Sequence, residues 1–148
     1  MKKKFMCMFM AAAMVLTMAA CGSKNDNADD SSNAGDAAET QTFTIGSSGP
    51  LTGDAAIYGI AVVQGAELAV EEINASDSAI KFNFLKQDDE ADGEKALNAY
   101  NTMMDDGMQV LVGPTTTGAS LTVSAQTNAD RVFMLTPSGS SPDITSGK

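Results

Sequence analysis

The amino-acid sequence predicts an α/β fold, a three-layer, doubly wound parallel sheet, from residue 41 to residue 148. Three observations lead to this prediction. Short apolar or alternating runs recur along the chain with segments of helical periodicity between them, in the order β-α-β-α-β-α-β. The two later runs, residues 110–112 and 132–135, are apolar throughout, as central parallel strands are. Each of these two runs also ends in a loop rich in glycine and hydroxyl side chains.

Residues 1–20 are predicted to be a lipoprotein signal peptide. Three lysines follow Met1, and residues 5–16 form an apolar stretch that is too short for a stable membrane anchor. Cys21 comes directly after two alanines, which resembles the site where bacterial lipoproteins are cleaved and lipidated, although Met18 stands where that pattern usually has leucine. The alternative is an ordinary secretory signal that is cleaved after an alanine, with Cys21 incidental.

Residues 21–40 consist almost entirely of Ser, Asn, Asp, Ala and Gly. Because such a segment cannot bury a core, we expect an acidic, disordered tether. A lipid on Cys21 would then hold the protein outside the cytoplasm, anchored to the bacterial cell membrane.

Charge and composition argue against two classes of function. The formal net charge is −10, and removal of the three lysines with the signal peptide leaves 6 basic against 19 acidic residues, a net charge of −13. Because such a surface repels phosphate backbones, nucleic acid is not an expected partner. The chain contains no histidine, the usual general base near neutral pH, which weighs against Ser-His or Cys-His catalysis.

The folded part is expected to begin with a strand at residues 42–46 and a loop rich in Gly and Pro. A helix should run from residue 56 to residue 75. Gly65 and the alanines of this helix would allow it to pack closely on a sheet. Its predicted apolar face consists of Val62, Ala66, Ala69, Val70 and Ile73.

Residues 80–84 alternate between apolar and polar, so this strand should have one solvated face and lie at the edge of the sheet. With the two later strands in the centre, the expected strand order is 2-1-3-4. A second helix, residues 93–106, is expected to be capped by Asp92 and ended by Gly107. Its predicted core-facing residues are Ala96, Tyr100 and Met103.

Three carboxylates, those of Asp88, Asp89 and Glu90, close the second strand and suggest a cation site as one interpretation. The calcium-loop spacing, with glycine at the sixth position and a final glutamate, is missing. We therefore favour a solvated capping loop, and expect neither a metal nor a cofactor.

The loops after the third and fourth strands carry the polar groups most suited to ligand binding. Residues 115–117 are three threonines directly before a helix, where a hydroxyl can cap the helix and free N–H groups attract an anion. Residues 138–141 offer hydroxyl and carbonyl oxygens that can accept hydrogen bonds from an ammonium. A zwitterion would suit both loops, but simple turns with capping residues explain the same pattern equally well. The Gly-rich phosphate motifs and the Gly-x-Ser-x-Gly nucleophile motif are missing.

An ordered set of short segments, at residues 45–53, 58–59, 65–74, 87–89, 112–113 and 135–138, carries a family resemblance. Together they resemble the branched-chain amino-acid-binding proteins of ABC transporters, which are type I periplasmic binding proteins. The resemblance implies two α/β lobes that close on the ligand. It implies that residues 41–148 form the N-terminal lobe. Because no closing helix follows the fourth strand, which leaves one face of the sheet poorly covered, and no second lobe is seen, we expect this lobe to be a truncated part of a longer protein.

The resemblance also implies which residues bind the ligand. The hydroxyl of Thr117 would hold the amino-acid carboxylate, Ser138 and Ser140 would hold the ammonium, and Tyr58 would contact the ligand. One departure is that some relatives carry a disulfide between the positions of Ala91 and Thr116, and this chain has neither cysteine.

These observations predict a leucine/isoleucine/valine-binding-protein-like lipoprotein of an ABC importer. It would capture a small aliphatic amino acid and deliver it to the membrane permease without covalent chemistry. The alternative is a binding-protein-like sensor or receptor for another small polar ligand, such as an amide or a sugar. Sugar sites stack rings on aromatic side chains, and these loops offer only Tyr58. An enzyme would need a catalytic acid or base in the loops, and none is visible there.

Overall fold

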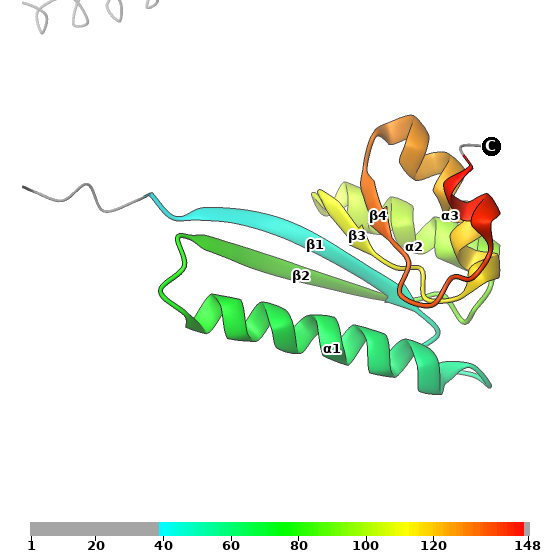
Figure 1. Ribbon diagram of the computed structural model, residues 1–148, viewed down its shortest axis with the longest axis horizontal. Coiled ribbons are helices and arrows are strands. Elements are labelled where there is room, and N and C mark those ends of the chain that lie inside the picture. Colours follow the sequence, from blue (N-terminus) through cyan, green and yellow to red (C-terminus); the bar gives the residue numbers. More distant parts are fainter. Residues whose placement is uncertain (1–38, 147–148) are drawn as a thin grey trace, which may run out of the picture. The chain divides into compact units, whose positions relative to one another are not determined.

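The computed structural model describes residues 39–146. The predicted signal peptide and residues 21–38 of the predicted tether, including Cys21, lie outside the described residues. The elements are β1 (Gln41–Gly49), α1 (Ala56–Ala75), β2 (Ile80–Asp88), α2 (Gly93–Asp105), β3 (Val110–Val112), α3 (Thr117–Asp130), β4 (Phe133–Leu135) and the 3₁₀ turn η1 (Pro142–Thr145) (Figure 1).

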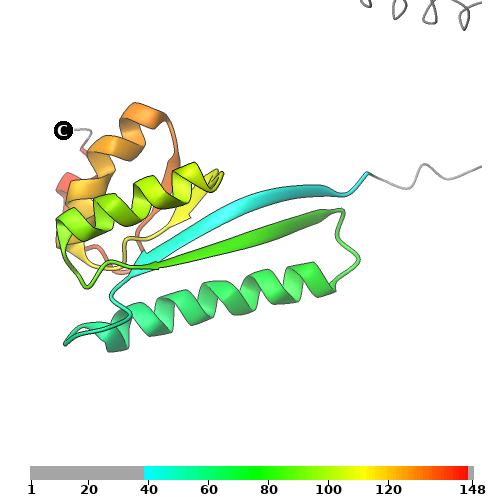
Figure 2. The same cartoon turned by 180° about the vertical axis from the view of Figure 1, so that it is seen from behind.

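The strands form one parallel sheet in the order β2-β1-β3-β4, which confirms the predicted order. α1 lies along one face of the sheet, and α2 and α3 lie on the other, so the predicted three-layer α/β architecture is also confirmed (Figures 1 and 2). β1 and β2 are longer than predicted. Their pairing continues from Ser47 opposite Lys86 to Gly49 opposite Asp88, and in β1 it includes residues 47–49, which the density of Gly and Pro had assigned to a loop.

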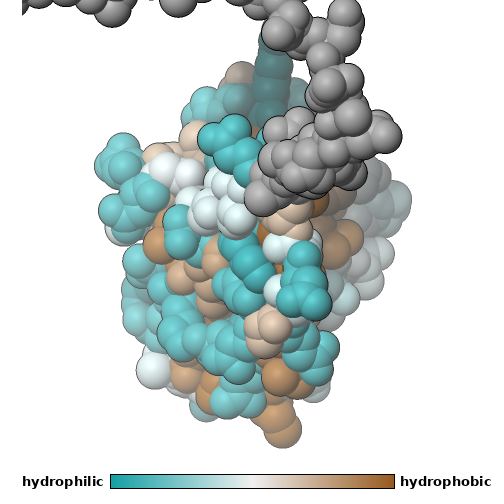
Figure 3. Space-filling model, turned by 90° about the vertical axis from the view of Figure 1, so that its left-hand side faces the viewer, coloured by the Kyte–Doolittle hydropathy of each residue, from teal (hydrophilic) through white to brown (hydrophobic). Residues whose placement is uncertain are grey.

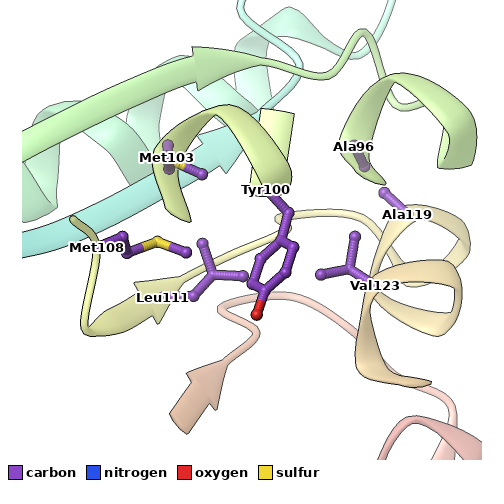
Figure 4. Packing of buried hydrophobic residues seen from close by; sticks show 7 residues of the cluster. All are labelled: Ala96, Tyr100, Met103, Met108, Leu111, Ala119 and Val123. Carbon is purple, nitrogen blue, oxygen red and sulfur yellow. The ribbon is translucent and has the colours of Figure 1, made fainter. Parts of the chain in front are cut away.

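The core between the sheet and α2 and α3 is built around Tyr100, Met103 and Leu111, which are almost fully buried (Figure 4). The predicted stripe of α2 is therefore confirmed, and Gly107 ends this helix with a φ of 86°. The Tyr100 hydroxyl donates to Asp130 Oδ2 at 2.9 Å, so the polar end of the buried ring has a partner. Burial is the main reason that the pKa of Tyr100 is raised, and Asp130 raises it further.

The prediction for α1 was partly wrong. Its buried residues are Gly59, Val63 and Val70, whereas Ala69 and Ile73 are exposed. Gly59, rather than Gly65, is the glycine that allows close packing. A Cβ at Gly59 would lie 2.1 Å from the carbonyl oxygen of Pro50, whereas a Cβ at Gly65 would meet nothing within 4 Å.

The apolar run of β4 was typical of a central strand, but β4 is last in the strand order, and within the described sheet it lies at the edge. Phe133 and Leu135 are 67% and 54% exposed. Leu135 pairs with Val112 of β3, which pairs with Ser47 of β1, which in turn pairs with Lys86 of β2. The side chains of these paired residues point to the same face of the sheet. Since the Lys86 ammonium reaches Glu67 of α1 at 2.7 Å, that face is the one covered by α1. The β3–β4 half of that face is apolar and only partly covered by the described residues.

The described surface is mixed in polarity. Figure 3 shows hydrophilic residues spread over the face nearest the viewer, with smaller hydrophobic areas between them. Among residues 39–146, no helix is both long enough and apolar enough to cross a membrane.

Candidate functional site

The loops after β3 and β4 are hydrogen-bonded to each other at the carboxyl edge of the sheet. The Ser138 hydroxyl donates to the carbonyl of Thr115 at 2.7 Å, and the Ser140 N–H donates to Thr117 Oγ1 at 3.1 Å. In an open parallel sheet, ligands bind outside this edge. The structure thus brings together three of the four predicted ligand residues, Thr117, Ser138 and Ser140.

Thr117 is arranged as a hydrogen-bond donor. Its Oγ1 already accepts the Ser140 N–H, so its single hydroxyl proton remains to be donated. The other neighbour of this oxygen is Ser140 Oγ at 3.4 Å, which is long for a hydrogen bond between hydroxyls. Thr117 is half-buried, and the next residue, Gly118, is exposed with open space around it. The free proton of Thr117 can therefore meet an acceptor such as a carboxylate.

Ser138 is arranged as an acceptor. Its proton is directed to the carbonyl of Thr115, and the residue is exposed. The remaining lone pairs of Ser138 Oγ can accept hydrogen bonds from a donor such as an ammonium.

No threonine hydroxyl caps α3, contrary to the prediction for residues 115–117. Thr116 is the N-cap residue but its side chain makes no capping bond, and its Oγ1 is buried without a partner. Thr115 Oγ1 donates to the carbonyl of Ser48 at 3.3 Å, and Thr117 is bonded to Ser140. The first-turn N–H groups of α3 are thus left without a side-chain acceptor, beside the hydroxyl of Thr117.

Tyr58, the fourth predicted residue, lies in the first turn of α1 and is 63% exposed. Its neighbour Gly59 packs against Pro50, which directly follows β1, so Tyr58 is held near the carboxyl end of β1. No hydrogen bond among residues 39–146 joins its side chain to the loops after β3 and β4.

Sequence reasoning missed Ser120 and Thr136. Ser120 is fully buried, and its hydroxyl oxygen lies 2.8 Å from that of Thr136. A signal for Ser120 was available, because it is a polar residue that shares helical spacing with the buried Val123 and Thr127.

The acidic loop after β2 is a capping loop, as favoured from the sequence, but it is not solvated throughout, because Asp89 is fully buried. Asp88 accepts hydrogen bonds from the Leu51 N–H at 2.8 Å and the Thr52 hydroxyl at 2.6 Å, which join the loops after β1 and β2. Burial alone would raise the pKa of Asp88, but these hydrogen bonds and that from Glu90 lower it below its ordinary value. Asp92 caps α2 by accepting from the Lys95 N–H at 2.9 Å. In the part of the chain that the structure describes, no cluster of three or more His, Cys, Asp or Glu residues could hold a metal.

Asp89, next in this loop, is fully buried. Its Oδ1 accepts from the Ala91 N–H at 2.9 Å, while its Oδ2 has no partner. Burial is the main reason that the pKa of Asp89 is raised, and the nearby charge of Asp88 raises it further.

A groove of about 350 Å³ lies elsewhere, between α3, β4 and η1. Its lining residues are Ser124, Thr127, Asn128, Val132, Met134, Leu135, Thr136, Ile144 and Thr145. None of the four predicted ligand residues lines it.

An α/β lobe whose hydroxyl-rich loops converge at the carboxyl edge of a parallel sheet has the architecture of a small-molecule-binding domain. The sequence model of a periplasmic binding protein family matches residues 42–148. The chain therefore belongs to the periplasmic binding protein family. This is a family of solute-binding proteins and not a class of enzymes.

Relatives of known name support the resemblance stated from the sequence. The chain is 36% identical over 105 residues to the Leu/Ile/Val-binding protein BraC3 of Rhizobium johnstonii, covering 70% of this chain and 29% of that protein. It is 37% identical over 109 residues to the Leu/Ile/Val-binding protein homolog 3 of Brucella melitensis, covering 70% of this chain and 28% of that protein. The chain thus spans less than a third of the length of these relatives.

Solved structures agree with these matches. The branched-chain amino acid transporter substrate-binding protein LivJ of Streptococcus pneumoniae, in complex with isoleucine, superposes with a TM-score of 0.67 at 29% identity. The match covers 72% of this chain and 32% of LivJ. A Desulfitobacterium hafniense substrate-binding protein in complex with leucine gives a TM-score of 0.59 at 30% identity, over 71% of this chain and 31% of that protein. The predicted resemblance to branched-chain amino-acid-binding proteins is therefore confirmed.

Proposed function

We propose that this chain binds a small amino acid as the substrate-binding component of an ABC importer. The observation that carries the proposal is the polarity of the two loops, in which Thr117 has a free donor and Ser138 a free acceptor. These polarities match the carboxylate and the ammonium of an amino acid. The uncapped N–H groups of α3 beside Thr117 favour negative charge at the same end.

The names of the relatives support a branched-chain or similar aliphatic ligand, since they include Leu/Ile/Val-binding proteins and an isoleucine complex. On this proposal, residues 41–148 supply one lobe of a two-lobed site, and the loaded protein delivers the amino acid to membrane permease subunits. The protein performs no covalent chemistry and needs no cofactor. A lipid on Cys21 would anchor it on the outer side of the cell membrane.

Calorimetric titration tests the ligand proposal. The protein is expressed from its gene without residues 1–20 and with Cys21→Ser, so that no lipid is attached. Leucine is compared with leucinamide, which lacks the carboxylate, and with isocaproate, which lacks the ammonium. Leucine should bind at least about tenfold more tightly than either analogue, because each analogue loses a charged hydrogen bond. Equal affinity for leucine and leucinamide would contradict the proposed carboxylate end.

The anchor is tested separately. Radiolabelled palmitate should be incorporated into the protein in cells and should be lost in Cys21→Ala. Labelling of Cys21→Ala at the original level would show that the lipid is not attached there.

A further inference from the structure

Three oxygen atoms form a compact junction beneath the candidate site. Ser120 Oγ and Thr136 Oγ1 each lie 2.9 Å from the carbonyl oxygen of Pro114, and 2.8 Å from each other. Ser120 and Pro114 are fully buried, and Thr136 is half-buried.

The number of protons determines how this junction is bonded. Two hydroxyl groups supply two protons to three short contacts. Either both hydroxyls donate to the Pro114 carbonyl, whose oxygen has two lone pairs, or one hydroxyl donates to the other and the second donates to Pro114. In both arrangements each hydroxyl supplies one of the two protons, so loss of either hydroxyl removes a hydrogen bond from the junction.

The junction joins the segments that carry the proposed ligand groups. Pro114 lies three residues before Thr117, and Ser120 lies three residues after it, within α3. On the other loop, Thr136 Oγ1 accepts the Gly139 N–H at 3.1 Å. Gly139 lies between Ser138 and Ser140, so this bond fixes the backbone from which both serines project.

The packing around Gly139 shows how closely the loop is held. A Cβ at this position would lie 2.6 Å from Thr136 Oγ1 and 2.7 Å from Ile144 Cδ1. The loop after β4 therefore lies directly on the junction, with no room for an intervening side chain.

We propose that Ser120 and Thr136 are positioning residues for amino-acid binding, which hold Ser138 and Ser140 at the correct place relative to Thr117. This inference rests on the proposed function for its effect on affinity. The buried Ser120 does not touch the ligand. The junction instead acts through the loop, because Thr136 holds the Gly139 N–H, and Gly139 lies between the two serines of the proposed ammonium end.

Two variants remove the hydroxyl groups. Thr136→Val keeps the shape of the side chain, and Ser120→Ala removes the buried hydroxyl of α3. Thr136→Ser restores the hydroxyl and serves as the rescue. Ser124→Ala is the matched control, because Ser124 lies one turn further along α3 and its hydroxyl donates to Leu121 of the same helix at 3.0 Å.

Two measurements are made on the same protein, expressed from its gene without residues 1–20 and with Cys21→Ser. Amide hydrogen exchange by NMR reports the Gly139 and Ser140 N–H groups, with the Leu111 N–H of β3 as a measure of global folding. Calorimetry reports the affinity for leucine. In Thr136→Val and in Ser120→Ala, the two loop amides should exchange about tenfold faster relative to Leu111, and leucine should bind about tenfold more weakly. Thr136→Ser and Ser124→Ala should match the unaltered protein in both measurements.

Each outcome decides the proposal. Unchanged leucine affinity in both Thr136→Val and Ser120→Ala would overturn it, whatever the exchange rates. Weakened binding that Thr136→Ser does not restore would also overturn it. If the unaltered protein bound no leucine, the proposed function would fail, and exchange would still decide the junction. Faster exchange at Gly139 and Ser140 would support its role in holding the loop, and unchanged exchange would overturn that role.

Discussion

Replacement of Thr117 by alanine is expected to weaken leucine binding by about 1.5–3 kcal/mol, the contribution of a hydrogen bond to a charged group. Thr117 Oγ1 accepts the Ser140 N–H, so its one hydroxyl proton is the group that the ligand loses. Ser140 is exposed, so its N–H returns to water and adds little to the loss. The dissociation constant should therefore rise about 10- to 150-fold.

The assay is calorimetry with leucine and leucinamide on the protein without residues 1–20, carrying Cys21→Ser. Leucinamide keeps a neutral carbonyl oxygen that can accept from Thr117 but has no carboxylate, so Thr117→Ala should weaken its binding less than that of leucine. The difference between the two ligands reports the charged part of the contact. Thr117→Ser keeps the hydroxyl and should bind leucine almost as the unaltered protein does. Unchanged leucine affinity in Thr117→Ala would remove Thr117 from the site. Equal weakening for both ligands would show that its hydroxyl acts on the loop and not on the carboxylate.

Three further outcomes are expected. The pKa of Asp89 is raised above its ordinary value of 3.8, so the folded protein holds the Asp89 proton more tightly than the unfolded chain does. This contribution to the free energy of unfolding is fully present below pH 3.8 and is lost as the pH rises through the folded-state pKa. In urea unfolding from about pH 3.5 to 7, the unaltered protein should lose stability relative to Asp89→Asn as the pH rises. Relative to Asp88→Asn it should instead gain stability as the pH rises, because the pKa of Asp88 is lowered. Gly59→Ala should lower the urea midpoint, because its Cβ would meet the carbonyl of Pro50 at 2.1 Å. Gly65→Ala has open space around its Cβ and should leave the midpoint unchanged or raise it. The same midpoint in both variants would contradict the packing of α1. On the proposed function, residues 41–148 expressed alone should bind leucine only weakly by NMR titration, because they supply one lobe of a two-lobed site and Tyr58 is 63% exposed there. A tight complex would show that binding needs no second lobe.

The sequence predicted the elements whose partners lie nearby in the chain. The stripe of α2 packs on Leu111 and Val123, which belong to the two elements that directly follow this helix, and its periodicity therefore indicated the core correctly. The predicted apolar stripe of α1 did not indicate the core correctly, because three of its five residues lie on a different flank of the helix. Glu67 is on the flank that reaches β2, and Val62, Ala69 and Ile73 lie on the flank away from β2. Periodicity identifies an apolar face but not which neighbouring element covers it.

The same limit explains β4. Its apolar run indicated burial on both faces, and Met134 does pack against the core beneath α2 and α3. Phe133 and Leu135 point to the other face, beside Val110 and Val112, where the described residues provide little cover. An apolar strand thus predicts that both faces are suited to burial, while the surrounding elements decide how much of each face is buried.

At the candidate site, the sequence identified the hydroxyl groups but not their hydrogen-bond directions. Three consecutive threonines have three different roles. The Thr115 hydroxyl donates to Ser48, the Thr116 hydroxyl is buried without a partner, and the Thr117 hydroxyl accepts from Ser140. Side-chain identity cannot distinguish them, because each direction depends on which backbone group the fold places opposite the hydroxyl.

On the proposed function, these directions let the lobe distinguish the two ends of a zwitterion without a charged side chain in either loop. Residues 113–120 and 136–142 contain no Asp, Glu, Lys or Arg. A donor at Thr117 and an acceptor at Ser138 suit a ligand that has opposite charges at its two ends and no net charge. The chain has a formal net charge of −10, so a simple anion would be repelled from its surface. A zwitterion has no net charge and avoids that repulsion, so the acidic surface and the neutral loops favour the same class of ligand.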